Sequence, residues 1–477
     1  MKLLKIKTMA NPLLNETNVS LNNPIFTDLL NNLQGHILKH HGRTHAYHIF
    51  LQFQPSKSKS AKKWLKGFSK KITSASKQLK DAENRRKDAT FDGGVFRNFS
   101  LSHTGYLHLG IDPAQIPSTD IPFTQGMEAR NGILNDNPHE WETAFQGKTI
   151  DALVIIADDN ASTALNECNT IKLVVNTFAT VVYVQKGKIL RNEHGLGLEH
   201  FGYVDGISQP NFLANNDSPS SQWDDNGAIL STVLVEDTGT TIPDSFGSYY
   251  VFRKLEQDVK GFKEAEEKEE NGKRNLPKVR DSHGKENKEL AGAMLVGRFE
   301  DGSEVVNHSF EKGIVASSQL ANDFDYRDDT AGLKCPFHSH IRITNPRADV
   351  SNDFAKSVRL TRRGIPYNDI GRDEFDLEAD QPTGGVGLLF QCYQSKIESQ
   401  FEFIQDRWSN QGNIGDGERR VGQDAIIGQG RNETPKHLPI QWGLPELHPQ
   451  AFTFGHFVTM KGGEYFFTPS IPFLKNL

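Results

Sequence analysis

The chain has 477 residues, which is long for one ordinary core and makes two domains the natural expectation. Hydrophobic residues make up 36% and charged residues 24%, a composition typical of a folded globular protein rather than a disordered or fibrous one. The net charge of -6 gives no reason to expect a polyanionic partner, so nucleic-acid binding is not predicted. The three cysteines are widely separated, which argues against a disulfide framework and suits a reducing compartment.

Residues 1–35 are rich in Asn, Leu and Thr and are predicted to form a loosely ordered arm. They contain no apolar run of signal-peptide length, and no stretch of the chain approaches the roughly 20 apolar residues that a membrane helix needs. We therefore predict a cytoplasmic protein with no membrane partner. Secretion by a route that needs no signal peptide stays compatible with the sequence.

The first half of the chain alternates between strand and helix signals. Alternating apolar residues predict strands at 46–54, 100–111, 151–159 and 178–187. Between them, a basic stretch with one apolar face at 57–87 and the segment 162–176 predict helices. This order favours α+β layering over a doubly wound parallel sheet.

The second half repeats this order. Strands are predicted at 247–255, near 291–299, in HSHIRITNPR (338–347) and at 385–394, and a helix at 395–408. The charge run at 262–288 is interpreted as a solvated helix and loop rather than a binding tail. Linker-like composition near 215–245 then predicts an arm at 1–35 and two domains at 36–225 and 226–477.

The stretch KCPFHSHIRITNPR concentrates three metal-ligand types, at Cys335, His338 and His340. On a strand, both imidazoles of an HxH pair lie on the same face, and two imidazoles with a nearby thiolate can bind zinc. The sequence supplies no matching CxxC or HExxH elsewhere. The other interpretation is that the histidines form hydrogen bonds in a partly buried sheet, and the spacing leaves both open.

Two other stretches place charged residues beside glycine. In EHFGYVDGISQP (199–210), Asp205 stands between Gly202 and Gly206, which permit either a tight turn or close approach to a flat ligand. In VRLTRRGIPYND (358–369), adjacent arginines precede a Gly and a Pro. Taken alone, the Asp205 stretch is more simply explained as an ordinary turn. The 358–369 stretch alone is more simply explained as a solvent-facing arginine pair.

Together, and in this order, the three stretches resemble the dye-decolorizing (DyP-type) peroxidases, which are haem enzymes. GYVDG is similar to the family's GxxDG motif, the region of His340 to the strand that carries the proximal haem histidine, and RRGIPY to the region of the distal arginine. The segments 33–43 and 387–408 are also similar to family sequences, so the resemblance spans nearly the whole chain. It implies two ferredoxin-like α+β domains with antiparallel sheets and peripheral helices, as in the dimeric α+β barrel superfamily.

The resemblance also implies a reaction and its residues. Asp205 matches the distal aspartate, Arg362 the distal arginine, and His340 the proximal ligand of the iron in a non-covalent haem b. A carboxylate can take a proton from H2O2 and return it to the leaving oxygen, while a permanently charged arginine donates hydrogen bonds to the polarised O–O bond. The expected activity is H2O2-dependent one-electron oxidation of phenols or anthraquinone-type dyes, with small aromatic reductants as partners.

Further residues complete the expected site. Cofactor contacts are predicted at Gly206, Ile207, Arg342, Leu388 and Phe390. A carboxylate is expected to orient the proximal histidine, and the candidates are Glu398, Glu402 and Asp406. Buried haem would need an electron relay to bulky donors at the surface, and the aromatics to test are Tyr367 and Trp408.

Two other functions remain open at this point. One is a haem-binding or haem-handling protein without turnover. The other is a zinc site built on Cys335, His338 and His340, which the resemblance disfavours because it gives His338 no ligand role and Cys335 a structural one. The sequence leaves open whether the protein is a monomer or a homo-oligomer.

Overall fold

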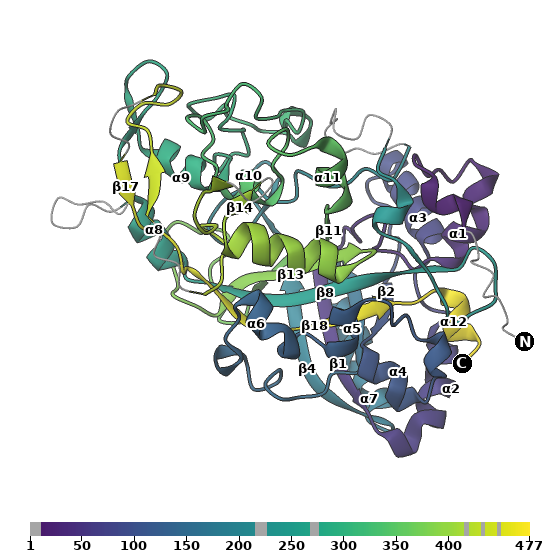
Figure 1. Cartoon of the computed structure of the whole chain (residues 1–477). Helices are drawn as coiled ribbons and strands as arrows, with labels where there is room; N and C mark the ends of the chain where they lie inside the picture. The colour runs from purple at the N-terminus through teal and green to yellow at the C-terminus, as the bar shows by residue number, and fades with distance from the viewer. Residues whose placement is uncertain (1–10, 215–226, 268–275, 415–418, 431–434, 446–449) are drawn as a thin grey trace, which may run out of the picture.

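The computed structural model describes residues 11–214, 227–267, 276–414, 419–430, 435–445 and 450–477 (Figure 1). The main elements of the first half are α1 (Thr27–Asn32), β1 (His45–Phe53), α2 (Ser58–Phe68), α3 (Ala75–Lys87), β2 (Phe96–Leu101), α4 (His103–Leu109), β3 (Ala152–Asp158), α7 (Ala161–Val175) and β4 (Ala179–Lys188). Those of the second half are β8 (Phe246–Gln257), α8 (Val259–Glu267), α9 (Lys288–Val296), α10 (His340–Thr344), α11 (Asn352–Ser357), β11 (Thr361–Arg362), β12 (Ile365–Asn368), β13 (Val386–Gln394), η10 (Ile397–Glu402), η11 (Ile404–Asn410), β18 (Val458–Thr468) and α12 (Ile471–Lys475).

The two halves build their sheets in the same way. In the first half the strand order is β2-β3-β1-β4, and in the second it is β12-β13-β8-β18, with every pairing antiparallel. In each half the first strand is central, a helical segment leads to a strand at one edge, and a second helical segment leads to a strand at the other edge. This is the ferredoxin-like arrangement that was predicted, repeated within one chain.

The two sheets are joined at both edges. β18 pairs with β2 through Phe467 and Leu101, which makes the strands one continuous sheet. At the opposite edges, the Gln185 side chain on β4 donates a hydrogen bond of 2.9 Å to Asp369, just beyond β12. Gly187 is required here because a Cβ atom would lie only 2.8 Å from a methyl group of Ile365. The sheet therefore curves until its outer edges meet.

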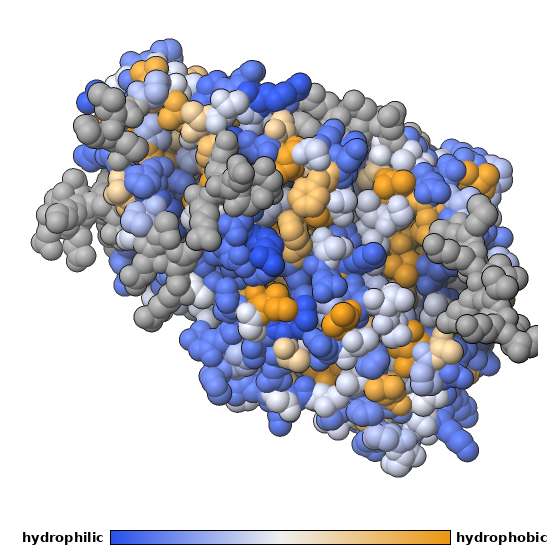
Figure 2. Space-filling view, viewed as in Figure 1, coloured by the Kyte–Doolittle hydropathy of each residue, from blue (hydrophilic) through white to orange (hydrophobic). Residues whose placement is uncertain are grey.

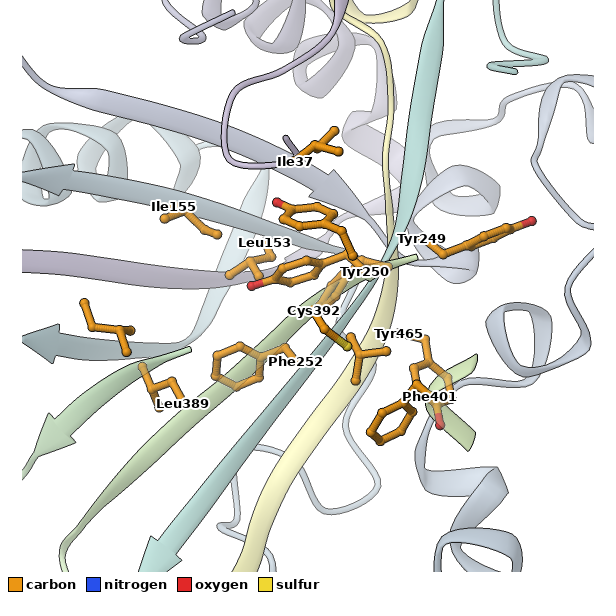
Figure 3. Packing of buried hydrophobic residues seen from close by; sticks show 14 of the residues in the cluster. Ile37, Leu153, Ile155, Tyr249, Tyr250, Phe252, Leu389, Cys392, Phe401 and Tyr465 are labelled. Atoms are coloured by element: carbon orange, nitrogen blue, oxygen red, sulfur yellow. The ribbon is translucent and has the colours of Figure 1, made fainter. Parts of the chain in front are cut away.

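One hydrophobic core serves both halves. Leu153 and Ile155 on β3 belong to the same buried cluster as Tyr250, Phe252 and Leu389 of the second half, and Figure 3 shows these side chains packed together. Large aromatic rings dominate the contacts; Phe50 and Phe252, for example, meet edge to face with centroids 4.9 Å apart. Burial of rings of this size supplies much of the driving force for holding two sheets together.

Most predicted elements are confirmed, but three predicted strands include helices. Residues 103–109 form α4, because Ser102 caps the helix by accepting from the Gly105 amide at 3.1 Å. Residues 288–296 form α9, which begins at the cap residue Asn287 and ends at Gly297 with φ +103°. Residues 340–344 form the short helix α10. Each is a short apolar run, for which periodicity cannot separate a buried strand from a buried helix.

The basic stretch 57–87 forms two helices, α2 and α3, instead of one. The prediction of a loose N-terminal arm is wrong for residues 12–33. Leu29, Leu30 and Leu33 are almost completely buried in the core, and Asn11 caps the first turn of this segment. Residues 1–10, part of the predicted linker and part of the charge run lie outside the described residues.

The surface in Figure 2 is mostly hydrophilic, with apolar side chains in small separate patches. Among the residues that the structure describes, no helix has the length and the apolar character needed to cross a membrane.

Candidate active site

A cavity of about 250 Å³ lies in the second half of the molecule. Its walls come from the loop 199–210, β8, α10, the start of β13 and the η10–η11 helix, with Val458 of β18 at one side. Asp205, Arg362 and His340 all line it, although they come from three separate segments of the chain. The fold thus gathers the three residues that the sequence marked as central.

The loop that carries Asp205 is held by a half-buried carboxylate. Glu199 accepts hydrogen bonds from the amides of Phe201 and Tyr203, both at 2.9 Å. Gly202 adopts φ +102° and Gly206 φ +81°, conformations that favour glycine. Burial, with a smaller contribution from the Asp205 charge, raises the pKa of Glu199 to about 7. The turn that sequence reasoning took as the simplest explanation is real, and it presents Asp205 to the cavity.

Arg362 lies beside Asp205. Its Nη1 is 3.5 Å from Oδ1 of Asp205, and both side chains are about one-third exposed to the cavity, at 34% and 37%. Its Nη2 donates to the Ser208 carbonyl at 2.8 Å, which fixes the guanidinium against the same loop. The neighbouring Arg363 points elsewhere and donates to the carbonyls of His36 and Ile37. The choice of Arg362 over Arg363 as the cavity residue agrees with this geometry.

His340 is the first residue of α10. Its Nδ1 lies 2.8 Å from Oδ2 of Asp424, a carboxylate with no exposed surface. The other oxygen of Asp424 accepts from the amides of Ile426 and Ile427 at 2.8 and 3.1 Å. An anionic carboxylate held in this way requires Nδ1 to carry the proton, which leaves the lone pair of Nε2 available.

None of the predicted partners bonds to His340 in the part of the chain that the structure describes. Glu402 pairs with Arg130 and accepts from the Tyr465 hydroxyl, while Asp406 accepts from Gln411 and Glu398 is exposed. The prediction of Glu398, Glu402 or Asp406 was therefore wrong. Asp424 follows a tight Gly-containing segment 84 positions after His340, and no local pattern connects the two.

Two buried arginines that were not predicted also line the cavity, Arg298 and Arg347. Arg298 donates from Nη1 to the Gly302 carbonyl at 2.8 Å, and its buried Nη2 meets no hydrogen-bond partner among the described residues. Burial and the charge of Arg347 lower the pKa of Arg298 to about 10, which still leaves it protonated near neutral pH. An unsatisfied cation in a cavity wall calls for an anionic group.

Arg342 was predicted to contact the cofactor, but the structure places it outside the cavity lining. Its side chain is fully buried. Its guanidinium pairs with Asp329 at 2.9 Å and Asp349 at 2.7 Å and donates to the Cys335 carbonyl. Arg342 therefore ties together the segments around α10.

The zinc interpretation of Cys335, His338 and His340 is also wrong. No group of three or more His, Cys, Asp or Glu side chains within the described ranges could hold a metal ion. Burial raises the pKa of the Cys335 thiol to about 12, so it stays protonated, and burial lowers the pKa of His338 to about 3. Because the segment turns into a helix at residue 340, the two histidines do not share a strand face.

The remaining predicted residues divide into two groups. Gly206, Ile207, Leu388 and Phe390 line the cavity. Tyr367 and Trp408, which were proposed as aromatics between haem and surface, are each only 1% exposed. The Tyr367 ring lies under Lys254 Nζ at 4.5 Å, and Trp408 belongs to a cluster with Ile343 and Val358. Neither can contact a bulky donor directly.

Replacing Asp424 by asparagine is expected to weaken the site without unfolding it. The amides of Ile426 and Ile427 would hold the asparagine carbonyl, and its NH2 group would face the Nδ1 proton of His340. Loss of such an orienting acceptor lowers metal affinity or activity by about 10- to 100-fold, measurable as affinity for the haem expected from the sequence and as the expected peroxidase rate. Asp406→Asn is the matched control, expected to stay within about twofold because its partners lie at the surface. Equal losses in both variants would contradict the assignment of Asp424.

Comparison with known proteins identifies the family. A family model described as "DyP dimeric alpha+beta barrel domain" matches residues 32–191, and one described as "Dyp-type peroxidase, C-terminal" matches residues 201–419. The chain is 38% identical to the multifunctional dye peroxidase DyP2 of Amycolatopsis sp., over 94% of this chain and 96% of that protein.

Solved structures agree. The crystal structure of the DyP-type peroxidase AnaPX of Anabaena sp. superimposes with a TM-score of 0.83 at 40% identity, covering 96% of each chain. A dye-decolorizing peroxidase in complex with 2,6-dimethoxyphenol superimposes with a TM-score of 0.75 at 28% identity, covering 94% of this chain and 98% of that one. Fold and site thus define an oxidoreductase that acts on peroxide as acceptor. The chain belongs to the DyP-type peroxidase family.

Proposed function

We propose that this protein is a haem b peroxidase in which Asp205 is the distal acid–base, Arg362 stabilises the developing charge, and His340 is the proximal iron ligand. The observation that carries the proposal is the convergence on one cavity of the Asp205–Arg362 pair and the Asp424-bound imidazole of His340. A haem peroxidase site needs an iron ligand and a group that moves protons on peroxide. His340 would serve as the ligand, and the Asp205–Arg362 pair would act on peroxide.

The residues of the cavity fit non-covalent haem b. His340 offers an Nε2 lone pair because Asp424 holds the proton on Nδ1. Leu388 and Phe390 provide apolar walls for a flat ring system. The buried Nη2 of Arg298, which meets no partner among the described residues, would donate a hydrogen bond to a haem carboxylate.

When bound, the haem supplies the redox chemistry that reduces peroxide at the expense of the donor. The Asp205 carboxylate takes a proton from one oxygen of H2O2 and returns it to the other oxygen, which leaves as water. Arg362 donates hydrogen bonds as negative charge develops on the leaving oxygen. Its bond to the Ser208 carbonyl keeps the guanidinium in place before the substrate arrives.

The donors that we propose are phenols and dye-type aromatics oxidised by one-electron steps. The relative with bound 2,6-dimethoxyphenol supports a phenolic donor. We also propose the domain limits 36–225 and 226–477, with haem in the last, and a cytoplasmic location. The three cysteines support a reducing compartment, since all are buried and free.

Titration with haem tests the proposal directly. The wild-type protein is expected to take up haem with a Soret band, and His340→Ala is expected to lose the imidazole-ligand spectrum and the peroxidase activity with it. His338→Ala is the matched control and should keep both, because His338 is buried away from the cavity. A wild-type protein that shows no Soret band, or a His340→Ala variant with an unchanged spectrum, would refute the assignment.

A further inference from the structure

A second cavity, of about 270 Å³, lies in the first half of the chain. Its walls are the loop 39–43, one side of α3 and the segment 91–96 that leads into β2. It shares no lining residue with the haem cavity among the residues that the structure describes. The peroxidase chemistry proposed above makes no use of it.

Cationic side chains outnumber acidic ones in the walls of this second cavity. Lys39, Arg43, Arg85 and Arg86 line it, together with the single carboxylate of Asp81. That carboxylate is already paired with Lys77 at 2.7 Å. Asp159 lies behind the wall and bridges Arg43 and Arg85, at 3.0 and 2.7 Å. One Asp159 carboxylate therefore faces the two guanidinium groups of Arg43 and Arg85, which leaves this pair of arginines with a net positive charge.

Arg43 pairs with Asp159 through Nη1, but another of its guanidinium nitrogens lacks a partner in the described part of the chain. The residue is only 6% exposed, and its buried Nε has no hydrogen-bond partner within the described ranges. Gly93 leaves room for the guanidinium, since a Cβ atom there would lie 2.3 Å from Nη2 of Arg43. A buried guanidinium N–H without an acceptor is costly, and an oxygen of a carboxylate or sulfonate would supply that acceptor.

The loop around Arg43 is held in one conformation. The amides of Gly42 and Arg43 donate to Nδ1 of His40 and His41, at 2.9 and 3.0 Å. Arg363 also donates to the carbonyls of His36 and Ile37, which lie just before this loop. Binding would therefore require little ordering of the protein, which favours affinity.

The other wall of the second cavity is apolar. Its lining there consists of Phe91, Val95 and Phe96, which are apolar, in contrast to the cations described above. The long-range field also favours an anion, because residues 57–87 contain twelve Lys and Arg but two acidic residues, in a chain whose net charge is -6. A ligand that satisfies both walls carries an aromatic ring and a negative group.

We infer that this second cavity binds a small aromatic anion, with its carboxylate or sulfonate on Arg43 and its ring against Phe91 and Phe96. The site is independent of the haem cavity, so its test does not depend on peroxidase turnover. The probe is 2-naphthalenesulfonate, titrated by calorimetry into the haem-loaded protein, with inorganic phosphate as the anion that has no ring.

Arg43→Gln is expected to weaken 2-naphthalenesulfonate binding by about tenfold or more, because a charge-assisted, buried contact is lost. Phe91→Ala should weaken it by about five- to tenfold through loss of ring contact, and it leaves the ion pairs intact if Arg43→Gln does not fold. Lys87→Gln makes the same charge change one position beyond Arg86, outside the lining, and should stay within about twofold.

Phosphate should bind the wild-type protein more weakly than the aromatic anion. Unchanged affinity in both Arg43→Gln and Phe91→Ala would overturn the inference, since the probe would then occupy another site. An equal loss in Lys87→Gln would also overturn it, by showing diffuse surface attraction. Phosphate binding as tight as that of 2-naphthalenesulfonate would overturn the assignment to an aromatic ligand.

Discussion

Asp205→Asn is expected to lower kcat/KM for hydrogen peroxide by about 10²- to 10⁴-fold, the range that general acid–base catalysis contributes. The amide cannot take a proton from peroxide, yet it preserves the size of the side chain and a carbonyl oxygen 3.5 Å from Arg362. Haem binding should change little, because Asp205 is not the iron ligand in the proposed site. Stopped-flow measurement of the reaction with peroxide separates these two effects.

Asp328→Asn provides the control for this prediction. Asp328 is exposed and belongs to the same half of the chain, but it does not line the cavity. Its variant should react with peroxide at the wild-type rate. If Asp205→Asn kept full activity, the carboxylate would not be the acid–base group; if wild-type protein bound haem without reacting with peroxide, a haem-handling role would be favoured.

Arg342→Met is expected to destabilise the protein by about 3–5 kcal/mol, the usual result of removing one partner from a buried ion pair. The side chain is fully buried, and its loss would leave Asp329 and Asp349 without the cation that they share. Asp329 also accepts from the amides of Leu333 and Cys335, so its burial cannot easily be relieved. Denaturant unfolding of the wild-type and variant proteins measures the difference.

Arg327→Met is the matched comparison, because Arg327 pairs with Asp325 at the surface and its side chain is 67% exposed. The change in unfolding free energy there should be below about 1 kcal/mol. A folded Arg342→Met variant should still bind haem with one-to-one stoichiometry. Wild-type stability combined with lost haem binding would instead return Arg342 to the cofactor site.

Long sheet strands were predictable from the sequence because their signal is local. β1, β3, β8 and β13 are rich in β-branched and aromatic residues, which favours a strand over a helix. α9 was missed because it is buried on nearly all sides and so lacks a polar face. α4 was missed because its start depends on Ser102 and on the space that Gly105 leaves beside the Asp151 carbonyl.

Site residues were predictable where the family motif marks them and not where only the fold brings them together. Asp205, Arg362 and His340 each stand in a short motif, and each lines the cavity. Asp424 reaches His340 only because the chain turns back after η11, a long-range event with no local pattern. Arg298 was missed for the same reason. Arg342 was included because it stands two positions after His340, and the sequence alone does not distinguish an arginine beside the cavity from one that lines it.

The position of β18 has a consequence for how the protein is made. This strand, at residues 458–468, lies between β8 and β2, and its first residue forms part of the haem cavity wall. A nascent chain still held by the ribosome at residue 440 would have both β8 and β2 without their shared neighbour. The wall of the active-site cavity is therefore complete only after synthesis of this strand, and a stalled chain would expose two open strand edges that are prone to pair with other chains.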